Sequence, residues 1–445
     1  MKKFIIINKK LESFSKKNIK VSGDKSLSIR FVILSSLAHG VSNAQNILKS
    51  EDVISAIRCI RKLGIKINVG NNSCKVFGKG LNGFKYKKNL TLDAGNSGTT
   101  ARLLTGALVD SNFKIKMTGD ASLKKRDMNR IINPLEKMGL KFKHKNGKLP
   151  FELINYEKPK NIFYQENLGS AQCKSAVMIA GLKTKGKMSL KCAKSRNHTE
   201  LMFKNVLKIP MDHKEIKNKY DLINFYGQKK IKSFNYKIPG DISSASFFIV
   251  LTLLSKKSNI EIKRVNINRS RLGIINILNK MNAKIKIVNR SFYKGEEVGD
   301  ILVESNSNLK SVNLNSKYNS SAIDEFLLIF LCAAKSKGVS KFYNLGELNK
   351  KESKRFDWGI KILKLIGIKV KKNKNFGLEI HGNPKLNVNK DIIINHFLKD
   401  HRIFMVTTIA ALTLGGNWKI FDPDSIKTSF PTFLKIIKNL GAKIN

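Results

Sequence analysis

Residues 360–372 read IKILKLIGIKVKK, and this stretch carries the pattern that decides the fold of the chain. Its apolar residues first follow the spacing of a helix, a glycine interrupts them, and isoleucine and valine then alternate with lysine. The stretch therefore predicts a helix that ends in a turn at Gly367 and a short, half-buried strand behind it.

The same pattern recurs along the chain. It is found at residues 57–68 (IRCIRKLGIKIN), 132–143 (INPLEKMGLKFK), 275–287 (INILNKMNAKIKI) and 433–445 (FLKIIKNLGAKIN), with a degenerate copy at 203–214. The turns fall 70 to 85 residues apart, at Gly64, Gly139, about Ile209, Asn282, Gly367 and Gly441. This period is too long for a solenoid repeat, so it predicts six small α/β units of two helices and several strands each.

The length of the chain sets the number of domains. A chain of 445 residues is too long for one core, so two domains of about 200 residues are expected. Three of the six units would fill each domain. The third unit ends near the turn at residues 238–241 (IPGD).

Two segments in the first quarter of the chain combine small residues with a cation: residues 22–30 (SGDKSLSIR) and 93–102 (DAGNSGTTAR). A turn at a helix start can bring N–H groups and a charged side chain onto one anion, so both segments are candidate cradles for a phosphate or carboxylate. In such a helix Ser26 and Arg30 lie on one face with Lys25 at its mouth. An ordinary capped, solvated helix start is the alternative.

Further segments rich in cations or hydroxyls follow in order. They are residues 118–130 (TGDASLKKRDMNR), 169–176 (GSAQCKSA), 195–200 (SRNHTE), 351–355 (KESKR) and 399–405 (KDHRIFM). Acidic residues are scarce, so Asp324, Glu325, Glu352 and Asp400 are candidates for proton transfer, although surface ion pairing is the alternative for Glu352. Asp241 is expected to cap a helix over residues 247–254.

The chain carries 84 basic and 32 acidic residues, a net charge of +52. Such an excess favours polyanions or small acidic substrates. A nucleic-acid binder concentrates its charge on one helix or interleaves it with aromatic residues. Here lysine is spread along the whole chain, which is typical of coding bias.

The cysteines and the hydropathy of the chain indicate what kind of protein this is. The five cysteines contain no Cys-x-x-Cys pair, so we expect reduced, structural thiols and no metal site. The N-terminus has only four consecutive apolar residues, too few for a signal peptide, and the longest apolar runs are half a membrane span. A soluble, cytoplasmic protein is expected.

Taken in order, ten segments of this chain resemble the motifs of the 5-enolpyruvylshikimate-3-phosphate (EPSP) synthase family. The segments are KSLSIR, GNSGTTARLL, GDASLKKRDM, SAQCKSA, SRNHTE, PGDISSASF, IDE, KKESKR, DHRIFM and TSFPTF. The resemblance implies a two-domain inside-out α/β barrel, with three βαβαββ units in each domain. Residues 1–21 and 241–445 would form the domain with the acid/base groups and part of the phosphoenolpyruvate site, and residues 22–240 the domain with the shikimate phosphate site.

The resemblance also implies the reaction. The enolpyruvyl group of phosphoenolpyruvate would pass to the 5-hydroxyl of shikimate 3-phosphate with release of phosphate, a step of the shikimate pathway toward chorismate and the aromatic amino acids. No cofactor and no metal would be needed. The implied partners are these two small molecules, without nucleic acid or membrane, and the implied state is a monomer that glyphosate inhibits.

Site residues follow from the resemblance, position by position. The implied contacts to shikimate 3-phosphate are Lys25, Ser26, Arg30, Ser170, Gln172, Ser195, Asp324 and Lys351. Those to phosphoenolpyruvate are Lys25, Gly98, Arg126, Gln172, Arg355 and Arg402. Lys25, Asp324 and Glu352 would be catalytic: Asp324 deprotonates the 5-hydroxyl, and Glu352 protonates the methylene carbon and later removes a proton.

The chain departs from the family pattern at three positions that flank these residues. Asp127 stands where proline is usual, and Asn197 and Lys354 where aspartate is usual. A C-terminal lysine of some relatives aligns with Lys427 or Thr428. The alternatives are enolpyruvyl transfer to a UDP-sugar on the same fold, and a basic, non-catalytic derivative that binds nucleic acid.

Overall fold

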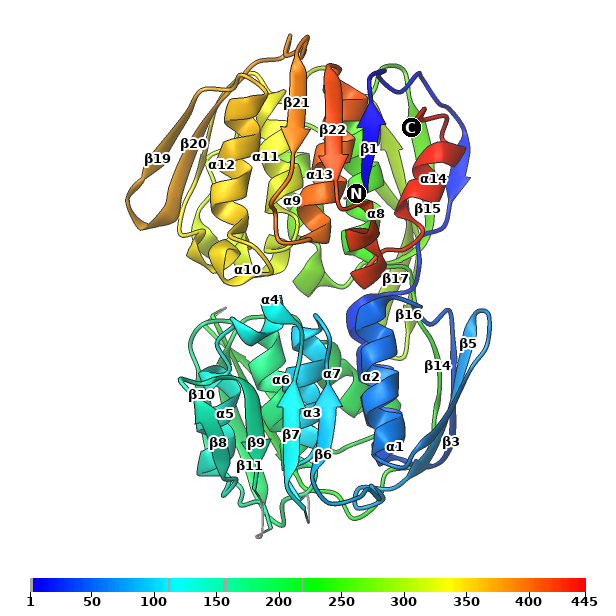
Figure 1. Cartoon of the computed structure of the whole chain (residues 1–445), viewed down its shortest axis with the longest axis vertical. Helices are drawn as coiled ribbons and strands as arrows, with labels where there is room; N and C mark the ends of the chain where they lie inside the picture. Colours follow the sequence, from blue (N-terminus) through cyan, green and yellow to red (C-terminus); the bar gives the residue numbers. More distant parts are fainter. Residues whose placement is uncertain (1–2, 111–112, 155–157, 218) are drawn as a thin grey trace. The chain divides into compact units, whose positions relative to one another are not determined.

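The computed structural model describes residues 3–110, 113–154, 158–217 and 219–445. The chain forms two compact units (Figure 1). Unit 1 consists of Met1–Ser22, Gly240–Ser291 and Glu297–Asn445, and unit 2 of Gly23–Pro239 and Phe292–Glu296. Each unit has a hydrophobic core of its own.

In the described part of unit 2 the strands form three four-stranded sheets, ordered β14-β3-β5-β4, β6-β7-β9-β8 and β10-β11-β13-β12. The strands are β3 (His39–Gln45), β4 (Lys66–Val69), β5 (Ser73–Lys79), β6 (Leu90–Asp93), β7 (Ile115–Thr118), β8 (Phe142–Lys145), β9 (Lys148–Leu153), β10 (Phe163–Glu166), β11 (Lys187–Ala193), β12 (Met211–Ile216), β13 (Tyr220–Tyr226) and β14 (Asn235–Lys237). The helices are α1 (Lys25–Leu37), α2 (Glu51–Lys62), α3 (Gly98–Ala107), α4 (Ala121–Lys124), α5 (Asn129–Lys137), α6 (Ala171–Gly181), α7 (His198–Leu201) and the π-helix η1 (Met202–Val206).

The second sheet of unit 2 displays the repeat in full. Strand β6 pairs in parallel with β7 after the crossover through α3, and α5 then leads to the antiparallel strands β8 and β9. The order is βαβαββ. In the first sheet, β14 comes last in the chain and takes the place of the first strand, parallel to β3.

The described strands of unit 1 also form three sheets, ordered β1-β22-β21, β16-β17-β15-β2 and β18-β20-β19. The strands are β1 (Phe4–Ile7), β2 (Lys17–Ile19), β15 (Asn259–Asn266), β16 (Lys284–Tyr293), β17 (Glu296–Glu304), β18 (Gly338–Phe342), β19 (Val370–Asn373), β20 (Gly377–Gly382), β21 (Asp391–Ile394) and β22 (Asn417–Phe421). The α-helices are α8 (Ile242–Leu254), α9 (Gly273–Lys280), α10 (Asn319–Ala322), α11 (Phe326–Ala334), α12 (Arg355–Leu365), α13 (His401–Leu414) and α14 (Phe433–Asn439), and the 3₁₀ turns η4 (Gly346–Lys350), η5 (Lys374–Phe376) and η6 (Pro423–Thr428) matter below.

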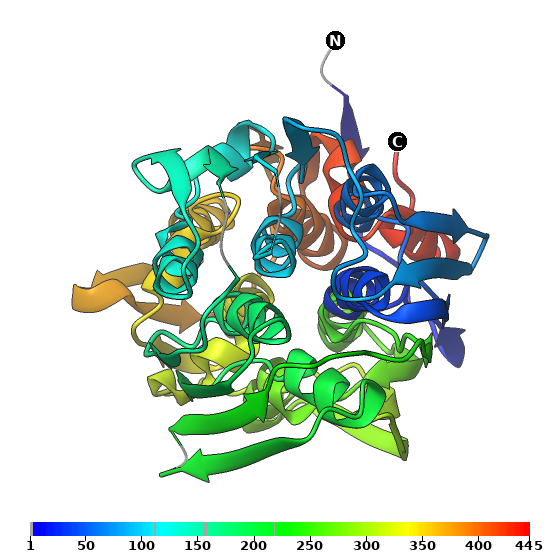
Figure 2. The ribbon, with the colours of Figure 1, turned by 90° about the horizontal axis from the view of Figure 1, so that it is seen from below.

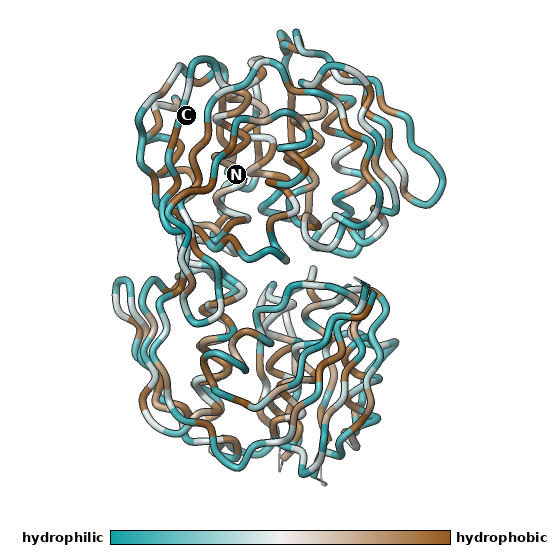
Figure 3. Tube along the Cα trace, turned by 180° about the vertical axis from the view of Figure 1, so that it is seen from behind, coloured by the Kyte–Doolittle hydropathy of each residue, from teal (hydrophilic) through white to brown (hydrophobic). Residues whose placement is uncertain are grey.

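Helices lie toward the inside of the fold and the sheets lie outside them (Figure 2). Helices that are apolar on all sides must be covered on all sides, and every residue of α11 and α13 is buried. The threonine hydroxyls of α13 bond back to the helix, as Thr407 does to the carbonyl of Ile403. Hydrophobic segments accordingly run through the interior of each unit (Figure 3). The expected inside-out α/β fold class is confirmed.

The predicted turns are also confirmed by the backbone. Left-handed φ angles occur at Gly64 (84°), Gly139 (98°), Asn282 (66°), Gly367 (84°) and Gly441 (103°). In the degenerate copy the left-handed residue is Lys208, one position before the expected Ile209, and it follows a π-helix. The helix expected over residues 247–254 begins earlier, at Ile242, because Asp241 accepts a hydrogen bond from Ser243 N (2.8 Å) and caps it there. None of the described helices combines the length and hydropathy that crossing a membrane requires.

Candidate active site

Several of the residues predicted for the site in unit 2 lie at the starts of its inner helices. Helix α1 begins at Lys25, α3 begins at Gly98, and Ser170 is the N-cap of α6. The side chains of Asp24, Ser97 and Ser170 accept hydrogen bonds from the N–H groups of Leu27, Thr100 and Cys173 and fix these helix starts. The positive end of a helix dipole suits an anion.

Lys25 makes an ion pair that sequence reasoning missed. Its Nζ lies 2.8 Å from Oδ2 of Asp52, and the two side chains are 20% and 8% exposed. Asp52 lies in the first turn of α2, where an acidic residue is ordinary. Nothing local in the sequence marks it as the partner of Lys25.

Arg30 is buried inside unit 2. Its Nε donates to Thr199 Oγ1 (2.8 Å), Nη2 donates to Ser175 Oγ (2.9 Å) and Nη1 donates to the carbonyl of Ser26 (3.1 Å). Burial lowers the pKa of Arg30 to about 10, although Glu200 and Asp24 favour its charge. A buried guanidinium held in this way gains from an anionic ligand.

A second cluster of unit 2 joins α3 to α6. Arg102 Nη1 donates to Gln172 Oε1 (2.5 Å), and Gln172 Nε2 donates to Thr99 Oγ1 (2.9 Å). A Cβ atom built on Gly98 would lie 3.0 Å from Nη1 of both Arg102 and Arg126. Gly98, Arg126 and Gln172 are therefore close neighbours, as expected, and Arg102 is an addition to the expected set.

Ser195 and Ser170 complete the hydroxyls expected in unit 2. Ser195 Oγ is buried and has no hydrogen-bond partner among the described residues. Ser170 N donates to Glu166 Oε2 (3.0 Å), which fixes the loop before α6.

In unit 1 one guanidinium organises the acidic residues. Arg355 is buried, and its Nη1 lies 3.3 Å from Asp324 Oδ1 while Nη2 contacts Glu352. Its Nε donates to Asp400 Oδ2 (2.9 Å) and its Nη2 donates to Asp400 Oδ1 (3.2 Å). Lys351 Nζ also lies 3.3 Å from Asp324 Oδ1. The two candidate acid/base groups are thus held by the same arginine.

Asp400 is the buried anchor of this group. It is the N-cap of α13 and accepts from Arg402 N (3.0 Å), and Ser353 Oγ donates to its Oδ2 (2.8 Å). Burial by itself would raise the pKa of Asp400, but the Arg355 guanidinium holds it below the ordinary value. Burial opposes the charge of Arg355, and Asp400 and Glu352 raise its pKa above the ordinary value.

Arg402 completes the expected set in unit 1. Its Nη1 donates to the carbonyl oxygen of Asp324 (2.7 Å) and lies 3.7 Å from Glu325 Oε1. Within unit 1 the structure therefore brings together three segments that are far apart in the sequence, represented by Asp324, by Lys351, Glu352 and Arg355, and by Arg402.

Comparison with known proteins decides the family. The family model of EPSP synthase (3-phosphoshikimate 1-carboxyvinyltransferase) matches residues 12–437. A protein of Ruthia magnifica subsp. Calyptogena magnifica named 3-phosphoshikimate 1-carboxyvinyltransferase is 39% identical over 96% of both chains. The chain belongs to the EPSP synthase family. The enzyme class expected from the resemblance is confirmed, and the family supports carboxyvinyl transfer over both alternatives.

Solved structures agree with this family. An EPSP synthase of Acinetobacter baumannii is 32% identical, covers 100% of this chain with 99% of its own, and superposes with a TM-score of 0.84. The enolpyruvyl transferase NikO of Streptomyces tendae, 13% identical, superposes with a TM-score of 0.78 over 99% of this chain. At that identity the likeness concerns the fold alone.

The departures from the family pattern lie beside the site residues. Asp127 contributes its carbonyl oxygen to Arg102 Nη2 (3.1 Å), and its side chain accepts from Asn129 N (2.9 Å). Asn197 and Lys354 occupy the N-cap positions of α7 and α12 and make no side-chain cap there. A lysine cannot accept from a backbone N–H, so α12 begins without the cap that aspartate would supply.

The two C-terminal candidates separate in the structure. Thr428 Oγ1 lies 3.1 Å from His401 Nδ1, beside Arg402, whereas Lys427 Nζ pairs with the exposed Asp424 (2.7 Å). Thr428 is therefore the one that contacts the first turn of α13. The five cysteines are free and buried.

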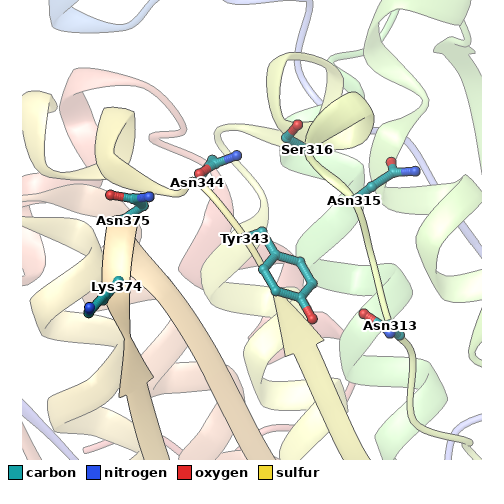
Figure 4. Close-up of a pocket in the computed structure, with 7 residues that line it drawn as sticks. All are labelled: Asn313, Asn315, Ser316, Tyr343, Asn344, Lys374 and Asn375. Carbon is teal, nitrogen blue, oxygen red and sulfur yellow. The ribbon is translucent and has the colours of Figure 1, made fainter.

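A separate pocket of about 600 Å³ opens in unit 1 (Figure 4). It is lined by Asn313, Asn315, Ser316, Tyr343, Asn344, Lys374 and Asn375, around the end of β18 and the η5 turn. It contains none of the predicted site residues. In the described part of the chain, no three His, Cys, Asp or Glu side chains are grouped so that they could hold a metal ion.

Proposed function

We propose that this chain transfers the enolpyruvyl group of phosphoenolpyruvate to the 5-hydroxyl of shikimate 3-phosphate and releases phosphate. The observation that carries the proposal is the match to the family over nearly the whole chain, together with Lys25, Arg355 and Arg402 in the first turns of helices and the contacts of Asp324 and Glu352 to Arg355. Both substrates are phosphorylated carboxylates. Basic side chains beside helix N-termini supply the charge that such anions need.

Shikimate 3-phosphate is assigned to Lys25, Ser26, Arg30, Ser170, Gln172 and Ser195 of unit 2, with Asp324 and Lys351 of unit 1. The burial of Arg30 and the unpartnered Ser195 hydroxyl support this assignment, because both groups gain from a polar, anionic ligand. Phosphoenolpyruvate is assigned to Lys25, Gly98, Arg126, Gln172, Arg355 and Arg402. Gly98 leaves room beside two guanidinium groups, which supports a compact anion there.

The chemistry is assigned to two carboxyl groups of unit 1. Glu352 protonates the methylene carbon of phosphoenolpyruvate, which leaves a positive centre at the adjoining carbon. The 5-hydroxyl oxygen attacks this centre while its proton passes to Asp324. Phosphate then leaves as the carbon–oxygen bond breaks, and Glu352 takes a proton back from the methyl carbon, so that the carbon–carbon double bond is restored and the enol ether product is formed. Asp324 and Glu352 both contact Arg355, which supports the fixed distance between the two carboxyl groups that these reaction steps need.

A phosphate-release assay tests the proposal. Purified full-length protein should release phosphate only when shikimate 3-phosphate and phosphoenolpyruvate are both present, at a rate that a chelator does not change. Each substrate alone and a UDP-sugar acceptor are the controls. Equal turnover with the UDP-sugar, or none with shikimate 3-phosphate, contradicts the proposal.

We further infer that the protein acts as a cytoplasmic monomer and has no nucleic-acid or membrane partner. The spread of basic residues along the whole chain supports this inference, because a polyanion site needs a concentrated patch. Light scattering coupled to gel filtration and a filter-binding assay with RNA and DNA test it.

A further inference from the structure

Helix α7 is one turn long, yet its first three residues each hold a buried polar side chain from another part of unit 2. His198 and Thr199 are fully buried and Glu200 is 2% exposed. The contacts are His198 Nδ1 to Glu296 Oε1 (2.7 Å), Thr199 Oγ1 to Arg30 Nε (2.8 Å) and Glu200 Oε1 to Lys174 Nζ (2.5 Å). We name these three residues the α7 clamp.

The centre of the clamp is a chain of hydroxyl groups that ends on the backbone of α6. Ser175 Oγ donates to the carbonyl of Ala171 (2.6 Å) and lies 2.7 Å from Thr199 Oγ1. A hydroxyl has a single proton. Since that of Ser175 is directed to Ala171, Thr199 donates to Ser175, and both hydroxyl oxygens are left as acceptors for Arg30.

This arrangement fixes the plane of the Arg30 guanidinium. Its Nε and Nη2 donate to the two hydroxyls, and its Nη1 donates to the carbonyl of Ser26. In the described part of the chain these contacts use three of the five N–H groups. The other two, one on each terminal nitrogen, form the pair with which arginine binds a carboxylate or phosphate in bidentate fashion.

The flanking contacts keep the clamp in place. The ion pair of Lys174 and Glu200 and the pair of His198 and Glu296 are both fully desolvated, so removing one partner would leave a buried polar group without its contact. Thr199 is thereby held between two anchored neighbours. Fixing an arginine side chain costs conformational entropy, because several of its bonds can otherwise rotate. In a preformed site this cost is already met on folding, so the ligand binds more tightly.

We propose that Thr199 and Ser175 are positioning residues for shikimate 3-phosphate: their hydroxyls hold Arg30 in the orientation that binds the substrate anion. The inference rests on the proposed function of Arg30 and adds two residues that do not touch the substrate. It concerns affinity for one substrate. Removal of either hydroxyl should therefore change the binding of shikimate 3-phosphate, while the binding of phosphoenolpyruvate and the chemical step are unaffected.

The test compares four substitutions in the full-length protein. Thr199→Val keeps the side-chain shape but removes the hydroxyl, and Thr199→Ser restores it. Thr105→Val is the matched control, because Thr105 is a buried threonine of unit 2 whose hydroxyl, among the described residues, donates only to the carbonyl of Ala101 (2.7 Å). Arg30→Lys reports on the proposed site itself. Calorimetric titration gives the Kd for shikimate 3-phosphate, steady-state assays give both KM values and kcat, and thermal melting checks folding.

Thr199→Val should raise the Kd and KM for shikimate 3-phosphate about tenfold, which is the scale of one hydrogen bond to a charged group, with kcat and the KM for phosphoenolpyruvate within about twofold. Thr199→Ser should recover most of the affinity, and Thr105→Val should match the unsubstituted protein. If Thr199→Val does not fold, Ser175→Ala decides by the same readouts.

The positioning role of Thr199 and the assignment of Arg30 to the substrate are contradicted by different results. A folded Thr199→Val protein with the Kd of the Thr105→Val control overturns the positioning role, provided that Arg30→Lys loses affinity. Unchanged affinity in Arg30→Lys instead overturns the assignment of Arg30 to the substrate.

Discussion

Arg355 and Asp400 are joined by two hydrogen bonds inside unit 1, from Nε to Oδ2 at 2.9 Å and from Nη2 to Oδ1 at 3.2 Å. Asp400 lies 45 residues after Arg355 and is fully buried. The remaining edge of the guanidinium faces Asp324 and Glu352. The buried aspartate therefore sets the orientation of the arginine on which both candidate acid/base groups depend.

Asp400→Asn should lower kcat by at least about tenfold and raise the KM for phosphoenolpyruvate, because Arg355 loses its buried counter-charge. The amide can still cap α13, so the helix start is kept. Breaking a buried ion pair typically costs about 3–5 kcal/mol, and urea unfolding should show a lower midpoint. Asp391→Asn, at an exposed aspartate of β21, is the control. Normal kinetics in Asp400→Asn would remove Asp400 from the positioning of Arg355.

The same pair predicts a pH dependence of stability. In the folded protein the pKa of Asp400 lies below its ordinary value, so the unfolded chain binds its proton more readily as the pH falls. The contribution to stability is complete above the ordinary carboxyl pKa of about 4 and is lost as the pH falls toward the folded value. The difference in urea midpoint between the unsubstituted protein and Asp400→Asn should be largest near neutral pH and shrink below about pH 4. A constant difference over that range contradicts the assignment.

Glu352→Gln tests the proposed proton transfer. Glutamine keeps the shape of the side chain and an oxygen for Arg355, but it cannot deliver the proton. Turnover should fall by about a hundredfold or more, the scale for a positioned acid or base, while the Kd values of both substrates change little. Glu347→Gln, in the neighbouring η4 turn and paired with Lys350 at the surface, is the matched control. Near-normal turnover in Glu352→Gln would exclude Glu352 from the mechanism.

The local parts of the fold could be predicted from the sequence. Glycine and asparagine mark the turns because they tolerate the left-handed backbone, as at Gly64 and Asn282, and all-apolar runs mark the inner helices. Gly295 marks a turn in segment Phe292–Glu296 in the same way, but no local pattern predicts that this segment is grouped with unit 2, where Glu296 contacts His198 of the α7 clamp. Its place depends on contacts between residues far apart in the chain.

The site divides in the same way. The cations and the capping residues at helix starts could be predicted from the sequence, because each of these motifs is local. Their partners were not: Asp52, Asp400 and Thr199 meet Lys25, Arg355 and Arg30 only after folding. No local pattern in a single sequence indicates which distant residues will pair. His401 likewise meets Thr428 of η6 only in the folded chain.

Gly98 carries the last prediction. It does not have a left-handed φ, so alanine meets no backbone strain at this position. A Cβ atom would lie 3.0 Å from Nη1 of both Arg102 and Arg126 and 3.6 Å from Leu123 Cδ1. The close neighbours are the ends of flexible side chains, which can shift by a few tenths of an ångström. The Gly98→Ala protein should therefore fold normally.

Gly98→Ala should weaken inhibition by glyphosate more than it weakens the binding of phosphoenolpyruvate. Glyphosate is the longer anion and occupies the phosphoenolpyruvate site in members of the family, so the added methyl and the displaced Arg126 leave it too little room. Overpacking of a tight contact costs about 1–3 kcal/mol, which corresponds to roughly a ten- to hundredfold higher inhibition constant. The KM for phosphoenolpyruvate should rise less, because the substrate is more compact. Both constants are measured on the same protein, and parallel increases would show that the methyl group disturbs the arginines without discriminating between the two anions.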